Sequence, residues 1–185
     1  MGAYSQVLNT AQLTSLVTQL LTTINASKSK AEIIIQMSCL SEMSKYLRSK
    51  LAPFLLKIIP LLQGLMMKVD PKNNDDQNEL TGACLETLQQ IVKSCPVQCA
   101  THIPDLFKNA MTLLEYDPNY AYDVNVKMTA DDDDGGWGSD FEEAQDQVDE
   151  DDSSWKVRKG AVDLFSAIIK ANKNFHTTII DKYAN

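Results

Sequence analysis

A chain of 185 residues, 44% of them hydrophobic, is long enough to form one domain with a buried core. Its net charge of −8 is uneven, because residues 117–152 hold 14 of the 25 Asp and Glu residues and a single base, Lys127. The rest of the chain is mildly basic. Nucleic acid is not expected as a partner, because phosphate binding needs a concentrated basic face that the acidic stretch would oppose. Neither a signal peptide nor a membrane-spanning run is visible, so a membrane partner is not expected either.

Apolar periodicity predicts a succession of amphipathic helices and no strand. In chain order, the predicted helices cover residues 13–24, 33–47, 51–67, 79–93, 103–114, 155–171 and 175–183. A polar segment with one proline and two asparagines, residues 70–76, is predicted as a loop between the third and fourth helices.

The second, fourth and sixth predicted helices share a pattern of apolar residues. Matched positions are held by Ile35, Leu80 and Val157, by Cys39, Cys84 and Ala161, by Leu40, Leu85 and Val162, and by Tyr46, Ile91 and Ile168. The spacing is 45 residues in the first step and 77 in the second, and the excess is close to the length of the acidic stretch. A period of roughly 40–47 residues with two helices per unit is typical of HEAT or armadillo repeats. An irregular helical bundle is the alternative.

We therefore expect an all-α fold of the HEAT or armadillo type, an α-solenoid in which antiparallel helix pairs stack into a right-handed superhelix. The expected units are residues 8–48, 51–95 and 102–171 and a partial repeat at 173–185, with the acidic stretch 117–152 inserted as a loop. Because the last helical pattern stops with the chain, we expect a piece of a longer solenoid or a subunit that meets another chain.

The acidic stretch has three interpretations: a solvated, disordered loop, an arm that docks on a basic partner, or a calcium site. An EF-hand loop fails in both possible registers, since its fifth position would be Gly135 in one and its first position Ala130 in the other. The candidate partner-binding residues are charged or aromatic and lie in the stretch or just after it: Asp131, Asp132, Asp133, Asp134, Trp137, Phe141, Lys156, Arg158 and Lys159.

The three cations after the stretch have two possible roles. They either pair with the preceding acids, Asp149–Asp152, or face an acidic patch on a partner. Trp155 is expected to pack beneath the point where the acidic stretch ends.

Four cysteines and two histidines are present, but they form no CxxC motif and no pair at the spacing of metal ligands. We expect no metal, no cofactor and no catalytic group. The thiols are predicted to be buried and reduced.

Two motifs flank the acidic stretch. Leu113-Leu114-Glu115-Tyr116-Asp117-Pro118-Asn119-Tyr120-Ala121-Tyr122-Asp123 leads into it, and Ser154-Trp155-Lys156-Val157-Arg158-Lys159 follows it. Together they resemble the cullin-associated, neddylation-dissociated exchange factor family, and Lys57-Ile58-Ile59-Pro60-Leu61 adds a third local match. The resemblance runs over residues 13–183. It departs from the family in residues 33–47 and where Gly135-Gly136-Trp137-Gly138 and Phe141 interrupt the acids.

The resemblance implies part of the N-terminal half of a long HEAT-repeat arch, and a non-enzymatic regulator of cullin-RING ubiquitin ligases in the cytoplasm and nucleus. Its partners would be unmodified cullin, the RING subunit and the remaining part of the arch, and it would support the exchange of adaptors and substrate receptors. The alternative is a fragment of an importin-β-type nuclear transport receptor, which is also a HEAT array and sometimes carries an acidic loop. A helical regulatory domain of a kinase or phosphatase is a third reading.

Overall fold

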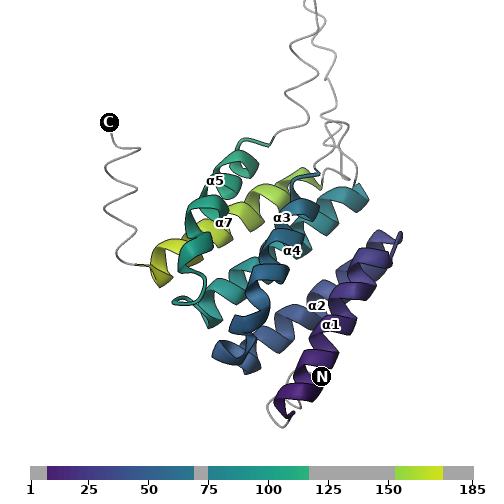
Figure 1. The fold of residues 1–185 in the computed structure, drawn as a ribbon. Helices are drawn as coiled ribbons and strands as arrows, with labels where there is room; N and C mark the ends of the chain where they lie inside the picture. Colours follow the sequence, from purple (N-terminus) through teal and green to yellow (C-terminus); the bar gives the residue numbers. More distant parts are fainter. Residues whose placement is uncertain (1–7, 69–74, 117–152, 173–185) are drawn as a thin grey trace, which may run out of the picture.

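The computed structural model describes residues 8–68, 75–116 and 153–172. The acidic stretch 117–152 and the predicted helix 175–183 lie outside these ranges. Within them the protein is all-helical, as predicted, and has no strand (Figure 1). The α-helices are α1 (Thr10–Ala26), α2 (Lys30–Leu47), α3 (Leu55–Met66), α4 (Asp75–Ser94), α5 (Ile103–Leu114) and α7 (Ser154–Ala171), and two 3-10 helices are η2 (Arg48–Phe54) and η3 (Ala100–His102).

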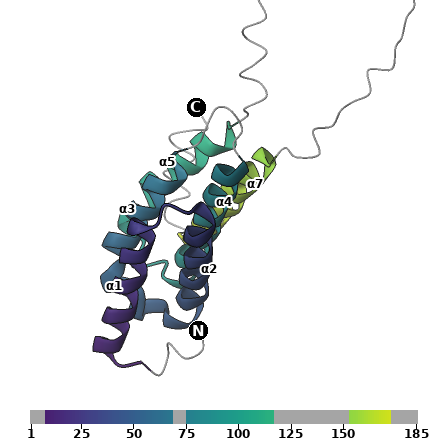
Figure 2. The ribbon, with the colours of Figure 1, turned by 90° about the vertical axis from the view of Figure 1, so that its right-hand side faces the viewer.

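The helices form two rows, which Figure 2 shows side by side. One row holds α1, α3 and α5, and the other holds α2, α4 and α7. Helices that follow one another in the chain pair across the rows, as α1 with α2, α3 with α4 and α5 with α7. Neighbouring pairs pack chiefly through α4, which lies between α2 and α7. This arrangement is compatible with stacked helical hairpins of the HEAT type.

Several helices begin before the apolar pattern that predicted them. The polar residues ahead of that pattern carry the capping groups. At α1, the Asn9 side chain accepts a hydrogen bond from the Gln12 backbone N–H at 2.9 Å, and the Gln12 side chain accepts one from the Asn9 N–H at 3.0 Å. Asp75 and Asp76, predicted to lie in a loop, form the first turn of α4. Carboxylates are favourable there because the helix dipole is positive at that end.

The predicted helix 51–67 is wrong at its start. The 3-10 helix η2 occupies Arg48–Phe54, and α3 begins only at Leu55. Two residues favour this break. Arg48 has φ 47°, which is outside the helical region, and Pro53 has no backbone N–H to donate to an α-helical turn.

Burial supports the predicted match of Leu40 with Leu85, which are both fully buried, but not two other matches of α2 with α4. Ile35 and Tyr46 were matched to core positions, but they are 67% and 39% exposed. A spacing of 44 residues instead of 45 brings buried residues of α2 onto buried residues of α4. It matches Met37 with Thr81, Leu40 with Cys84, Met43 with Thr87, and Leu47 with Ile91.

Burial supports the predicted step of 77 residues from α4 to α7 at three positions. Leu80 with Val157, Cys84 with Ala161 and Ile91 with Ile168 are all buried. The match of Leu85 with Val162 is wrong, because Val162 is 51% exposed. Helix α4 has a row neighbour on each side, so it buries a wider face than α7 does.

One helical run in the described part of the chain, Lys30–Met66, is long and apolar enough to cross a membrane by length and composition. It is not a single straight helix, because η2 separates α2 from α3 within it. Its apolar side chains, such as Met37, Ile58 and Leu62, lie in the shared core. Burial covers 33% of the most apolar window, so packing accounts for part of the composition of this run.

Helices α4 and α7 approach closely at Gly160. A Cβ atom on Gly160 would stand 3.1 Å from both Cβ and Cδ1 of Leu85, which is fully buried. At Gly82, on the same face of the row, a Cβ would meet no atom within 4 Å. The two glycines therefore have different roles, although both lie inside helices.

We expect Gly82→Ala to raise the free energy of unfolding by roughly 0.5–1 kcal/mol, because alanine favours a helix. Gly160→Ala should lower it by about 1 kcal/mol, because overpacking against Leu85 outweighs the same gain. Urea denaturation followed by circular dichroism measures both variants. Equal stabilisation by the two substitutions would contradict the close approach.

Three of the four thiols are buried, as predicted, and none of the four is in a disulfide. Burial raises the pKa of Cys84 to about 12. Burial also raises the pKa of Cys99 to about 12, and the charge of nearby Cys95 adds to this shift. The pKa of Cys95 is itself raised by burial. Cys95 Sγ donates a hydrogen bond to the Arg48 carbonyl at 2.9 Å. Cys39 is half-buried.

A thiol reagent at pH 8 should therefore modify Cys39 well before the other three, since only a thiolate reacts and the buried thiols stay protonated. All four should react at similar rates in guanidinium. Because the folded protein holds protons that the unfolded chain releases above its thiol pKa, stability should fall as pH rises from about 9 to 12. Mass spectrometry of partly labelled protein identifies the sites, and early labelling of Cys84 would contradict this expectation.

Candidate functional site: a groove across α2, α4 and α7

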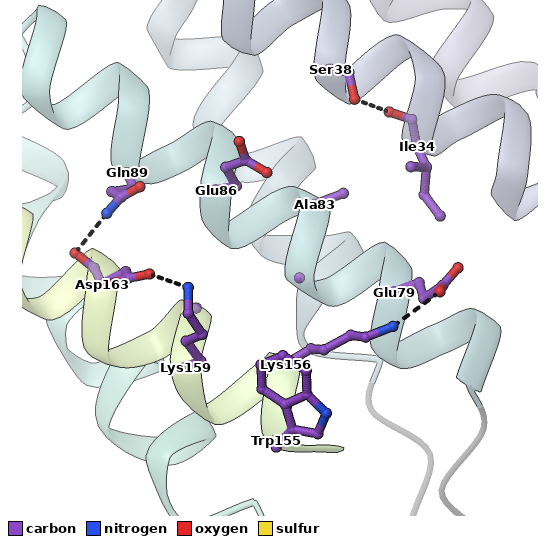
Figure 3. Close-up of a pocket in the computed structure, with 12 residues that line it drawn as sticks. Ile34, Ser38, Glu79, Ala83, Glu86, Gln89, Trp155, Lys156, Lys159 and Asp163 are labelled. Atoms are coloured by element: carbon purple, nitrogen blue, oxygen red, sulfur yellow. Dashed lines mark hydrogen bonds and ion pairs between the residues drawn. The ribbon is translucent and has the colours of Figure 1, made fainter. Parts of the chain in front are cut away.

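A groove of about 730 Å³ crosses the row formed by α2, α4 and α7 (Figure 3). Three small residues of α4 and α7 line it: Gly82, Ala83 and Gly160. The open space above Gly82 is part of this hollow. The remaining lining residues are Ile34, Ser38, Glu79, Glu86, Gln89, Trp155, Lys156, Lys159 and Asp163.

Helical spacing explains why these residues share one surface. Glu79, Gly82, Ala83 and Glu86 follow one another at intervals of three, one and three residues, which places them on one face of α4. The buried face of α4, with Leu80 and Cys84, faces the other way into the core. The groove is therefore the solvent side of the helix that holds the row together.

Two ion pairs cross the surface of the groove. Lys156 Nζ lies 3.3 Å from Glu79 Oε1 and links α7 to α4, and Lys159 Nζ lies 3.2 Å from Asp163 Oδ2 within α7. All four side chains are 43–66% exposed, and such pairs contribute only about 0–1 kcal/mol each. Their main effect is to orient both lysines and neutralise their charge. Glu86 makes no hydrogen bond or ion pair with another described residue.

The structure brings two of the candidate residues, Lys156 and Lys159, into the groove but not Arg158. The Arg158 guanidinium donates to the Tyr116 carbonyl at 3.0 Å and to Ser154 Oγ at 3.2 Å. Asp131, Asp132, Asp133, Asp134, Trp137 and Phe141 lie outside the described residues, as do the acids 149–152 that were expected to pair with the three cations.

Trp155 was expected to pack beneath the end of the acidic stretch, which lies outside the described residues. Its side chain is 51% exposed and lines the groove. The reason is local: Val157, two residues later and fully buried, occupies the core position of this first turn of α7. Sequence reasoning also missed Glu79 and Glu86, which look like ordinary exposed residues of a helix. The Gly82-Ala83 pair between them was the one sequence feature that could have indicated a hollow on this face of α4.

A second polar cluster lies at the base of the acidic stretch. Tyr116 and Ser153 flank that stretch, and the buried Asn78 of α4 joins them. Tyr116 OH donates to Asn78 Oδ1 at 3.1 Å, and Asn78 Nδ2 donates to Ser153 Oγ at 3.0 Å. Ser153 Oγ donates in turn to an Asp75 carboxylate oxygen. The two ends of the stretch therefore meet at one side chain, which we call the Asn78 clamp.

Metal ligands do not gather in the part of the chain that the structure describes. No group of three or more His, Cys, Asp and Glu side chains there is placed to hold an ion. The groove and the Asn78 clamp both depend on α4.

The fold defines a class: an all-helical protein whose helices pair across two rows, with a groove along one of the rows. The chain is similar to cullin-associated NEDD8-dissociated protein 1 of Drosophila melanogaster, with 30% identity over 113 residues, or 58% of this chain and 9% of that protein. It is 26% identical to cullin-associated NEDD8-dissociated protein 2 of Mus musculus over 158 residues, which cover 83% of this chain and 12% of that protein.

A third relative is the C-terminal part of cullin-associated NEDD8-dissociated protein 1 of Emericella nidulans, 32% identical over 114 residues, or 54% of this chain and 11% of that protein. These relatives confirm the resemblance seen in the sequence. The chain spans about a tenth of their length. Placement in the N-terminal half of the arch stays a prediction, since one relative is itself named a C-terminal part. No family model matches the chain.

We expect Asn78→Ala to lower the free energy of unfolding by roughly 2–3 kcal/mol, because it removes one buried and one partly buried hydrogen bond and leaves Ser153 without that donor. Asn25→Ala is a matched control, since Asn25 is exposed and bonds only to the Leu21 carbonyl of its own helix. That variant should change stability by less than about 0.5 kcal/mol.

A double-mutant cycle of Asn78→Ala with Tyr116→Phe, measured by urea denaturation, tests the clamp directly. The two substitutions should be non-additive, since they remove the same hydrogen bond. Strict additivity would show that Tyr116 and Asn78 act independently.

Proposed function

We propose that this chain is a HEAT-type helical array that binds cullin-RING ubiquitin ligases as a non-enzymatic regulator. The observation that carries the proposal is the similarity, over 113–158 residues, to proteins named for association with cullins and dissociation from NEDD8. The stacked helix pairs and the groove across α2, α4 and α7 support it, because arrays of this kind recognise partners through extended surfaces.

In this proposal the chain contacts unmodified cullin and its RING subunit, in the cytoplasm and nucleus, as part of a right-handed solenoid. With the remaining part of the HEAT arch, it supports the exchange of adaptors and substrate receptors. The chain's share of about a tenth of the relatives' length favours a contribution to binding rather than the whole exchange reaction. The acidic stretch 117–152 is a solvated loop inserted between α5 and α7.

Binding of the 185-residue protein to a purified cullin–RING complex tests the proposal. The complex is immobilised with and without covalently attached NEDD8, and affinity is measured by biolayer interferometry. We expect binding to the unmodified complex to be at least about tenfold tighter, a difference of about 1.4 kcal/mol.

A transport GTPase loaded with GTP serves as the control, because the importin-type alternative predicts that it binds and the present proposal predicts that it does not. Equal affinity for the two forms of the cullin complex, or binding to neither, would count against a cullin regulator that discriminates the modifier.

A further inference from the structure

Trp155 is the largest apolar group on the rim of the groove. Its side chain is 51% exposed at the start of α7, where it lines the groove beside Lys156. A half-exposed tryptophan leaves a large apolar area in water, and side chains of this type dominate the energetics of protein interfaces when a partner covers them. Trp155 is therefore a candidate anchor.

The small side chains of the groove provide room beside this anchor. Gly82, Ala83 and Gly160 replace the larger side chains that would otherwise fill the surface between the helices. The hollow of about 730 Å³ is large enough for several side chains of a partner segment. An inserted apolar group would contact Trp155 from one side and the surface of α4 from another.

Charge decides which kind of segment fits. The groove holds three acids and two bases, and the two lysines are already paired with Glu79 and Asp163. Glu86 remains without an ion pair in the described structure, on the solvent face of α4 between α2 and α7 (Figure 3). Lys45, on α2, forms its ion pair with Glu42, and its charge also interacts with Glu86 at longer range. The lining residues of the groove therefore carry one more negative than positive charge, and Glu86 is the acid among them without an ion pair in the described structure.

We propose that the groove receives a segment of the partner protein that presents a Lys or Arg to Glu86 and an apolar side chain to Trp155. The identity of that partner, a cullin–RING complex, rests on the function proposed above. An acidic segment fits less well, because it would have to displace Glu79 and Asp163 from their lysines and would be repelled by Glu86.

Affinity of groove variants for the unmodified cullin–RING complex tests this assignment. We expect Trp155→Ala to weaken binding about 10- to 100-fold, as truncation of an anchoring aromatic does. Glu86→Gln should weaken it about threefold, and Glu86→Lys by about tenfold or more, because the reversed charge repels the partner's cation. Binding of the native protein should weaken with added salt, and Glu86→Gln should reduce that dependence.

Matched controls come from the other row of helices. Leu56→Ala removes an apolar side chain that is 73% exposed on α3, and Glu115→Lys reverses an exposed acid at the end of α5. Both should bind like the native protein. Circular dichroism melts of all variants show whether each is folded.

A spectroscopic readout reports on Trp155 itself. The chain has two tryptophans, so in a Trp137→Phe variant the emission comes from Trp155 alone. Its emission should shift to shorter wavelength on titration with a cullin–RING complex whose own tryptophans are replaced by a non-emitting analogue. Unchanged emission at saturation would show that the groove stays open to water, and would overturn the assignment.

The outcomes separate the two proposals. If the native protein binds and the Trp155 and Glu86 variants bind equally well, the groove assignment fails and the proposed function stands. Tighter binding by Glu86→Lys would show that the groove takes an acidic segment, which also overturns the assignment. If the native protein does not bind the cullin complex at all, the proposed function fails and the groove assignment fails with it.

Discussion

The burial of α4 between α2 and α7 is the constraint on which the rest of the structure depends. A helix with neighbours on both sides and α3 behind it must bury polar as well as apolar groups, and each polar group then needs a partner. Thr87 Oγ1 shares its proton between the Ala83 carbonyl of its own helix, at 2.8 Å, and the Met37 carbonyl of α2, at 3.2 Å. Thr81 Oγ1 donates to the Met66 carbonyl of α3 at 3.4 Å. Asn78 contacts the start of α7 in the same way, through Ser153. Helix α4 thus fixes its three neighbours through apolar packing supplemented by directed bonds, and such bonds specify one packing rather than many.

The clamp and the groove meet at the first turns of α4. Asn78 points into the protein and joins the two ends of the acidic stretch, while Glu79, the next residue, points to the surface and pairs with Lys156 of α7. The buried bonds of Asn78 contribute more to stability than the exposed pair, because water competes for the latter. The buried bond of Asn78 to Ser153 therefore helps to fix the position of α7 against α4. The geometry of the groove depends on that position, because both helices line it. A long insertion between α5 and α7 is compatible with this packing because its two ends are held together.

The sequence predicted the existence of the described α-helices, and the 77-residue step from α4 to α7 at three positions, because long amphipathic helices carry a strong periodic signal. It failed in places where that signal is ambiguous. In the run Ile33-Ile34-Ile35 any residue could face the core, and only packing shows that Ile33 is buried and Ile35 exposed. The start of α3 was missed because a 3-10 segment with a positive φ at Arg48 carries no periodic pattern. In the candidate site, Lys156 and Lys159 were identified from charge. Trp155 and Glu86 were not identified, because only neighbouring residues on other helices show that these two side chains line one groove.

The charge distribution links the acidic stretch to the groove without requiring that they touch. The stretch with fourteen acids follows Tyr116 and precedes Ser153, which both contact the first turns of α4, and the groove on the same helix holds Glu86, which forms no ion pair with a described residue. A field of one sign near a binding surface raises the encounter rate of partners of the opposite sign, and the effect decays over about 8 Å at physiological ionic strength. In the proposed function, the acids favour the approach of a basic partner, and Glu86 and Trp155 act after contact. Loss of the stretch should consequently slow association, and loss of the groove residues should speed dissociation, so the two elements contribute to the same affinity through different rate constants.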